Sequence, residues 1–154
     1  MGTVNTNHYV IMDYWRDKAI CKNGDIITED EAGRRRYIDT IPVIKDWGEP
    51  MCWGCSKPII GDYEKKCESE SYDEDDIKKL WLDKKVKSKL NRCHIVPASL
   101  DGEDRPENLF LMCESCHILS PDSRNKEGFF RWVYRQRQSM DMGRESVEET
   151  MRLV

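Results

Sequence analysis

Two pairs of cysteines are spaced as ligands of one tetrahedral metal ion. Cys52 and Cys55 enclose Trp-Gly, and Cys113 and Cys116 enclose Glu-Ser. A Cys-x-x-Cys spacing lets both thiolates of a pair approach one ion, and four thiolates are a common ligand set for structural zinc. A single pair would also suit redox chemistry, whereas two pairs favour metal. We therefore predict a structural Zn²⁺ site, the alternative being four reduced thiols packed as small hydrophobic residues.

A zinc ion with four protein ligands is not expected to carry out catalysis. Such a site leaves no coordination position open for water or substrate. Its expected role is structural, because it would join segments about sixty residues apart in the sequence. Zinc binding would contribute on the order of 10–16 kcal/mol of apparent binding free energy. Any chemistry must therefore come from other residues.

Three polar residues near the second cysteine pair are candidates for that chemistry. His94 precedes Ile-Val-Pro, Asn108 follows Pro-Glu, and His117 directly follows Cys116. An imidazole with its ordinary pKa near ~6.5 accepts protons at neutral pH and binds divalent metals. Each residue also has an ordinary structural explanation, respectively a core histidine, a turn cap and a spare zinc ligand. Their joint occurrence is what favours a functional site.

The stretch around these residues resembles the HNH endonucleases, a family with the ββα-metal fold. It runs RCHIVPASLDGEDRPENLFLMCESCH over residues 92–117, with CWGC at 52–55 upstream, as in the zinc-containing branch with two Cys-x-x-Cys pairs. The resemblance is close over about residues 52–137 and faint or absent over 1–50 and 139–154. It implies a small ββα-metal core stapled by the four-cysteine zinc site, with flanking helices.

The resemblance also implies a metal-dependent DNA endonuclease that hydrolyses phosphodiester bonds to 5′-phosphate and 3′-hydroxyl ends. It makes His94 the general base that deprotonates the attacking water, and His117 a ligand of the catalytic divalent metal. Asn108 would hold the loop and orient the base. Mg²⁺ or another divalent ion is the implied cofactor, since a metal there contacts the scissile phosphate and stabilises the departing 3′ oxygen. DNA is the implied partner.

One position departs from the family's pattern. The residue before the catalytic histidine is often Asp, Glu or His and serves as a second metal ligand, whereas here it is Cys93. A thiolate is a soft ligand that prefers zinc-like ions to Mg²⁺. Either Cys93 binds a softer catalytic metal, or it faces the core and water completes the shell. Side chains alternate along a strand, and His94 must face the substrate, so the second alternative is favoured.

Charged residues are segregated along a chain whose net charge is −4. The net charge therefore gives no general argument for nucleic-acid binding. Seven acids lie between Glu64 and Asp76, whereas the segment Lys78–Arg92 has seven Lys or Arg residues and one acid. Such blocks are most often solvated surface, but beside the site they are expected to contact phosphates. The candidates for these contacts are Arg34–Arg36, Lys78–Arg92 and Arg131–Arg137, and in particular Arg92, Arg131 and Arg135.

The composition excludes several classes of protein. Hydrophobic residues make up 38% and charged residues 35%, which allows a modest core and differs from a disordered chain. No apolar run reaches the roughly 18 residues of a membrane span, and the N-terminus lacks a signal-peptide pattern. Seven cysteines are an odd number. We therefore expect a reducing, cytoplasmic location, metal rather than a full set of disulfides, and no membrane partner.

The pattern of apolar, capping and turn residues predicts an α+β domain. Thr28 and Glu31 form a capping-box pattern at the start of a short helix. Predicted helices cover residues 29–37, 73–89, 113 to before Pro121, and 127–139, and predicted strands cover 90–97 and 108–112 around a loop at 98–106. We divide the chain into an N-terminal arm with one short helix at 1–50, a zinc-containing nuclease domain at 51–138, and a helical C-terminal tail at 139–154.

Two other functions remain open at this point. A non-catalytic, zinc-stapled nucleic-acid-binding module of the same fold would explain Cys93 and the acidic net charge. A zinc module for protein interaction would use the acidic run at 64–76 and the tail at 141–154. The oligomeric state is also open, because one site cuts one strand and double-strand cleavage would need a homodimer or two binding events.

Overall fold

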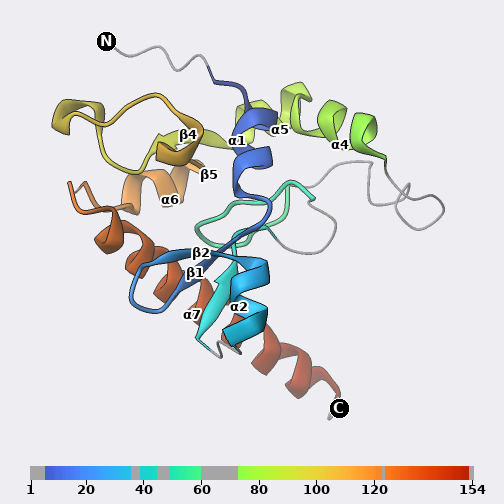
Figure 1. The fold of residues 1–154 in the computed structure, drawn as a ribbon. Helices are drawn as coiled ribbons and strands as arrows, with labels where there is room; N and C mark the ends of the chain where they lie inside the picture. Colours follow the sequence, from blue (N-terminus) through green and yellow to red (C-terminus); the bar gives the residue numbers. More distant parts are fainter. Residues whose placement is uncertain (1–5, 36–38, 45–48, 60–72, 123, 153–154) are drawn as a thin grey trace.

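The computed structural model describes residues 6–35, 39–44, 49–59, 73–122 and 124–152. It is an α+β fold with small sheets, as the sequence predicts (Figure 1). In chain order the helices, strands and 3₁₀ turns (η) are α1 His8–Trp15, β1 Lys18–Cys21, β2 Ile26–Thr28, α2 Glu29–Arg35, β3 Thr40–Pro42, α4 Glu74–Trp81, α5 Lys84–Lys89, β4 Asn91–His94, η1 Ala98–Leu100, η2 Pro106–Asn108, β5 Leu109–Met112, α6 Glu114–Leu119 and α7 Lys126–Arg152. Within the described ranges, no helix combines the length and the apolar character needed to cross a membrane.

An antiparallel hairpin of β4 and β5 is the scaffold of the candidate site. Cys93 of β4 pairs with Phe110 of β5, and α6 follows β5 directly. The elements therefore have the ββα order that the family resemblance implies. β4 ends at His94, earlier than predicted. The reason is that the side chain of Asn108, rather than a neighbouring strand, pairs with the backbone N–H and carbonyl of Val96.

The single helix predicted over residues 73–89 is in fact two helices, α4 and α5. Asp73 caps α4 in a capping box with Asp76, as its acid-rich first turn favours. The helix then stops, because the side chain of Asp83 accepts a hydrogen bond of 2.9 Å from the N–H of Lys85 and begins a new helix. An aspartate that bonds a nearby backbone N–H competes with continuation of the helix. The prediction of one continuous helix was wrong for this reason.

The short helix predicted after Thr28 is α2. The hydroxyl of Thr28 accepts a hydrogen bond of 3.1 Å from the N–H of Glu31, which is one half of the predicted capping box. The predicted helix end at Tyr37 and the side chains of Arg34–Arg36 lie outside the described residues.

The N-terminal part of the chain contains more structure than that one predicted helix. α1 buries Ile11, Met12 and Trp15, each 2% exposed or less. β1 is the central strand of an antiparallel sheet with the order β2-β1-β3. α7 packs against β1, and α1 packs against β5 and η2. The arm is therefore folded onto the rest of the molecule.

One aromatic cluster joins the arm, the first cysteine pair, the hairpin and α7. Its centre is Phe110, which is fully buried. Four rings surround Phe110 at centroid distances between 5.1 and 5.9 Å, and they belong to Trp15, Trp53, Phe129 and Phe130. All four meet Phe110 edge to face, an arrangement that aromatic pairs prefer. Segments far apart in the sequence thus share one core.

α7 contains the helix predicted over residues 127–139 and continues to Arg152. Val133, Tyr134 and Arg137 of this helix are buried. The guanidinium of Arg137 donates a hydrogen bond of 3.0 Å to the carbonyl of Val43. α7 is thereby attached to the N-terminal part of the chain as well as to the hairpin.

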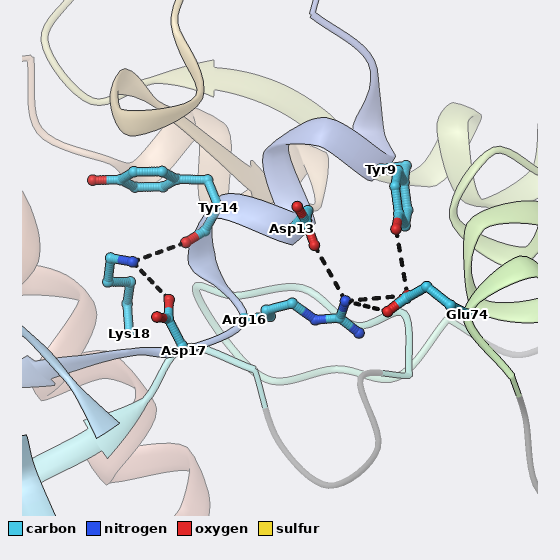
Figure 2. A network of polar contacts seen from close by, with 7 residues as sticks. All are labelled: Tyr9, Asp13, Tyr14, Arg16, Asp17, Lys18 and Glu74. Carbon is cyan, nitrogen blue, oxygen red and sulfur yellow. Dashed lines mark hydrogen bonds and ion pairs between the residues drawn. The ribbon is translucent and has the colours of Figure 1, made fainter. Parts of the chain in front are cut away.

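A polar network fixes α1 against α4 (Figure 2). Arg16 Nη1 lies 2.6 Å from Glu74 Oε1 and 3.2 Å from Asp13 Oδ1. The hydroxyl of Tyr9 donates a hydrogen bond of 3.3 Å to the other oxygen of Glu74. The hydrogen bond from Arg16 lowers the pKa of the Glu74 carboxyl. Because these carboxylates are exposed, we expect the network to orient α1 rather than to add much stability.

His8, at the start of α1, is a buried structural histidine. It is 4% exposed, and its Nε2 donates a hydrogen bond of 2.7 Å to the carbonyl of Leu90. Burial lowers the pKa of His8 below its usual 6.5, and the positive charges of Arg92 and Lys87 act in the same direction, whereas the hydrogen bond opposes them.

This lowered pKa predicts a loss of stability at acid pH. The unfolded chain takes up a proton at position 8 near pH ~6.5, whereas the folded chain does so only at lower pH. The stabilisation is therefore complete above pH ~6.5 and lost as the pH falls through the pKa of the folded state. We expect the Tm of the wild type to fall more steeply between pH ~7 and ~5 than that of His8→Gln, whose amide can still donate to Leu90. Parallel thermal-melting curves would contradict the prediction.

Candidate metal centre and active site

The four predicted zinc ligands lie together in the structure. The Sγ atoms of Cys52, Cys55, Cys113 and Cys116 are all within 4.8 Å of one another. Thiolates around a tetrahedral zinc at ~2.3 Å would be about 3.8 Å apart, so a small contraction would complete the site. Hydrogen bonds from the thiols of Cys116 and Cys52 lower the pKa of Cys55, which favours its thiolate form. The cluster is compatible with structural zinc.

N–H groups surround the sulfurs of this cluster. The backbone N–H groups of Gly54 and Cys113 donate to Cys52 Sγ at 3.3 and 3.2 Å. The side-chain amide of Gln136 in α7 donates to Cys116 Sγ at 3.1 Å and to the carbonyl of Gly54 at 2.9 Å. Such donors stabilise the negative charge of thiolates and tune the metal site. Gln136 was not predicted, because nothing in the sequence of a long amphipathic helix distinguishes it from other surface glutamines.

Gly54 is needed between the two ligands of the first pair. A Cβ atom at this position would lie 3.0 Å from both Met112 Sδ and the Cβ of Cys116. That is tighter than ordinary carbon contacts, so a larger residue would push the first pair away from the second. The glycine thus permits the close approach of the two Cys-x-x-Cys segments.

His94 ends β4 and forms a close pair with Asp104. Its Nε2 lies 2.5 Å from Asp104 Oδ1, and its side chain is 20% exposed. An ionised carboxylate can only accept hydrogen bonds, so His94 Nε2 carries the proton in this pair. In the neutral ring the lone pair is then on Nδ1. Asp104 was not predicted. It is one of several acids in the loop at 101–107, and the sequence of this loop does not indicate which acid would pair with His94.

Asn108 closes the loop between β4 and β5. Its Oδ1 accepts from the N–H of Val96 at 2.9 Å, and its Nδ2 donates to the carbonyls of Val96 and Glu103 at 3.0 and 2.9 Å. Asn108 thus fixes the backbone two residues after His94, and in the described part of the chain no hydrogen bond joins it to the imidazole itself. The same loop requires glycine at position 102, because a Cβ atom there would lie 1.7 Å from the Val96 carbonyl oxygen.

His117 is exposed on α6, next in sequence to a member of the four-cysteine cluster but separate from that cluster. Its Nδ1 lies 3.2 Å from the side-chain amide nitrogen of Asn91 in β4. Among the described residues, the four cysteines are the one group of three or more His, Cys, Asp or Glu side chains placed to hold a metal ion, and His117 is not part of it. β4 and α6 are in contact, but no described hydrogen bond joins His94 to His117.

The chain was compared with known proteins. Residues 82–120 match the HNH endonuclease family. The chain carries an HNH segment. This segment runs from the end of α4 through α6, covers about a quarter of the chain, and contains His94, Asn108, His117 and the second cysteine pair. No curated protein and no solved structure matches the chain.

Within the HNH segment, Cys93 points into the core. Its side chain is 1% exposed, and the thiol donates to the carbonyl of Asn91 at 3.4 Å. Burial raises the pKa of Cys93 to about 12. The structure places this thiol on the opposite side of β4 from His94. Of the two alternatives for Cys93, metal ligand or core residue, this position corresponds to the core residue. Water or another group would then have to complete the shell of a metal held by His117.

A buried carboxylate at position 93 is therefore expected to destabilise the fold. Cys93→Asp should lower the free energy of unfolding by several kcal/mol, since an ionised or poorly hydrogen-bonded carboxyl is costly in an apolar core. Thermal or denaturant unfolding, compared with Cys93→Ser, measures the effect. A Cys93→Asp protein of unchanged stability whose activity shifts toward Mg²⁺ would show that the thiol position faces the metal instead.

The basic residues within and after the HNH segment differ in accessibility. Arg131 and Arg135 are exposed on α7. Arg92 is half-buried on β4, and its Nη1 donates to the carbonyl of Thr6 at 3.1 Å. Arg137 was included in the stretch expected to contact phosphates, but it is fully buried and bonded within the fold. That part of the expectation was wrong, because helical periodicity turns position 137 toward the core. The acidic residues 64–72 lie outside the described residues.

Proposed function

We propose that this chain is a metal-dependent DNA endonuclease that leaves 5′-phosphate and 3′-hydroxyl ends. The observation that carries the proposal is the hairpin of the HNH segment. At its end His94 pairs with Asp104, and Asn108 holds the loop between the two strands by bonding the backbone of Val96. HNH domains generally act on nucleic acid, and the arrangement suits a positioned base beside a phosphodiester.

In this proposal His94 is the general base. Asp104 holds Nε2–H of His94, so that Nδ1 is the atom that removes a proton from the attacking water. Asn108 positions the base indirectly, by fixing the backbone at Val96. A base held in one tautomer and one orientation loses less freedom on reaching the transition state.

His117 is the proposed ligand of the catalytic metal. A divalent ion bound there, Mg²⁺ or another, would stabilise negative charge on the scissile phosphate and the departing 3′ oxygen. The amide nitrogen of Asn91 can only donate, so it occupies the lone pair of His117 Nδ1, and this amide would have to turn before the ring binds a metal. Cys93 takes no part in binding this ion, because its thiol lies in the core.

The other parts of the chain have supporting roles. The four cysteines hold a structural zinc that fixes α6 relative to residues 52–55. Exposed Arg131 and Arg135, together with Arg92, contact phosphates without reading the base sequence. The boundaries at 50/51 and 138/139 and a reducing, cytoplasmic setting form part of the same proposal.

The proposal is tested by incubating supercoiled plasmid with the protein and Mg²⁺, Mn²⁺, Ni²⁺ or Zn²⁺, with and without a chelator. We expect nicked or linear DNA that is lost on chelation, and nicks that DNA ligase reseals because they carry 5′-phosphate and 3′-hydroxyl ends. DNA that stays supercoiled with every metal would contradict the proposal.

The second candidate is a zinc-stapled module that binds nucleic acid without cutting it. It is favoured by one observation: among the described residues, His117 belongs to no group of three or more His, Cys, Asp or Glu side chains placed to hold a metal ion. This candidate predicts a mobility shift of duplex DNA together with no cleavage under any metal. The plasmid experiment and a binding assay on the same sample separate the two functions.

A further inference from the structure

Trp15 of α1 is hydrogen-bonded to the turn that presents Asn108. Its indole Nε1–H lies 2.9 Å from the carbonyl of Pro106 and 2.9 Å from that of Leu109. The ring is 2% exposed and packs edge to face against Phe110. A single buried donor thus bridges two carbonyls on either side of Asn108. The Pro106 carbonyl also accepts from the backbone N–H of Leu109, so the indole is a second donor there and ties this carbonyl to that of Leu109.

These two carbonyls lie on either side of Asn108 in the chain. Pro106 begins η2, Asn108 ends it, and Leu109 begins β5. The amide of Asn108 then makes three hydrogen bonds, two of them to the backbone of Val96, two residues after His94. The bonded path therefore runs from Trp15 through η2 and Asn108 to the backbone that carries the imidazole.

Two further contacts connect the arm with the same loop and with β4. The hydroxyl of Thr6 donates to the carbonyl of Asp104 at 3.4 Å, and the carbonyl of Thr6 accepts from Arg92 at 3.1 Å. The network of Figure 2 holds the other side of α1 against α4 through Arg16 and Glu74. None of these arm residues lies within the HNH segment at 82–120.

We propose that Trp15 is a positioning residue of the nuclease site, and that α1 is an integral part of that site. This inference rests on the proposed function for its catalytic consequence. The indole N–H fixes η2, so that Asn108 holds Val96 and the backbone places His94. Trp15 contacts no substrate and acts only through these residues.

The test replaces the indole N–H and leaves the ring. Benzothienylalanine at position 15 has a sulfur in place of the N–H and nearly the same shape. Trp15→Phe is a simpler substitution, but it also removes part of the buried ring. We expect kcat for plasmid cleavage to fall about tenfold to a hundredfold with KM within about twofold, since a misplaced base costs rate rather than binding. Hydrogen exchange of the Val96 N–H, which bonds Asn108, should become faster.

Phe130→Leu is the matched control. Phe130 is 2% exposed and packs against both Trp15 and Phe110, but its side chain makes no hydrogen bond. This control should lower the Tm at least as much as the benzothienyl replacement while kcat and Val96 exchange stay near wild type. Equal effects of both variants would overturn the proposal, as would unchanged Val96 exchange in the benzothienyl protein. If the wild type cleaves no DNA, the proposed function fails, and Val96 exchange alone decides whether Trp15 positions the loop.

Discussion

His94→Ala is expected to slow DNA cleavage by ~10²–10⁴-fold, the usual contribution of a positioned general base. In the proposed mechanism the imidazole acts on the proton of the attacking water in the transition state and adds little to binding of the ground state. The side chain is partly exposed at the end of β4, so its removal should leave the fold intact. Rates of plasmid cleavage under saturating metal measure the effect.

Three controls separate loss of the base from loss of structure. The zinc content, the Tm and the affinity for duplex DNA of His94→Ala should stay near those of the wild type. His117→Ala should instead weaken metal binding, so part of its activity should return as the metal concentration is raised. Full activity of His94→Ala would remove this residue from the mechanism.

Cys116→Ser should cause the largest loss of stability of any substitution considered. It removes one of four ligands from a site whose zinc binding is worth on the order of 10 kcal/mol, and small domains have a total stability of about 5–15 kcal/mol. We expect close to one equivalent of zinc in the wild type after dialysis without chelator, much less in the variant, and a variant that is poorly soluble or unfolded. Elemental analysis and circular dichroism provide the measurements.

Cys21→Ser is the matched control for the zinc site. Cys21 is also buried, on β1, but it lies outside the four-cysteine cluster. This substitution should cost no zinc and only the modest stability expected for a polar atom in a core position. A Cys116→Ser protein that melts like the wild type would show that the cluster holds no structural metal.

The sequence was sufficient to predict the hairpin, α6 and the four-cysteine cluster. The hairpin and α6 are encoded locally: Leu109–Met112 is a short apolar run, and the second cysteine pair begins a helix that must stop before Pro121. The two cysteine pairs lie about sixty residues apart, but their matching Cys-x-x-Cys spacing is enough to indicate that they share one ion. The structure brings the four sulfurs together as predicted.

The features that sequence analysis did not predict depend on contacts between distant segments. β2 and β3 have three residues each, too few for a periodic pattern to indicate a strand. The pairing of Asp104 with His94 depends on the path of a loop, and the contact of Trp15 with η2 spans more than ninety residues. Asp83 was misjudged because the same residue type is found both within helices and at their caps.

The position of Phe110 has a consequence for synthesis of the protein on the ribosome. Trp15 and Trp53 are translated before Phe110, whereas Phe129 and Phe130 are translated after it. A nascent chain that ends just after His117 has every proposed catalytic residue but lacks Phe129 and Phe130 of α7, which pack against Phe110. If the chain cuts DNA as proposed, products that end before Phe129 should therefore be inactive.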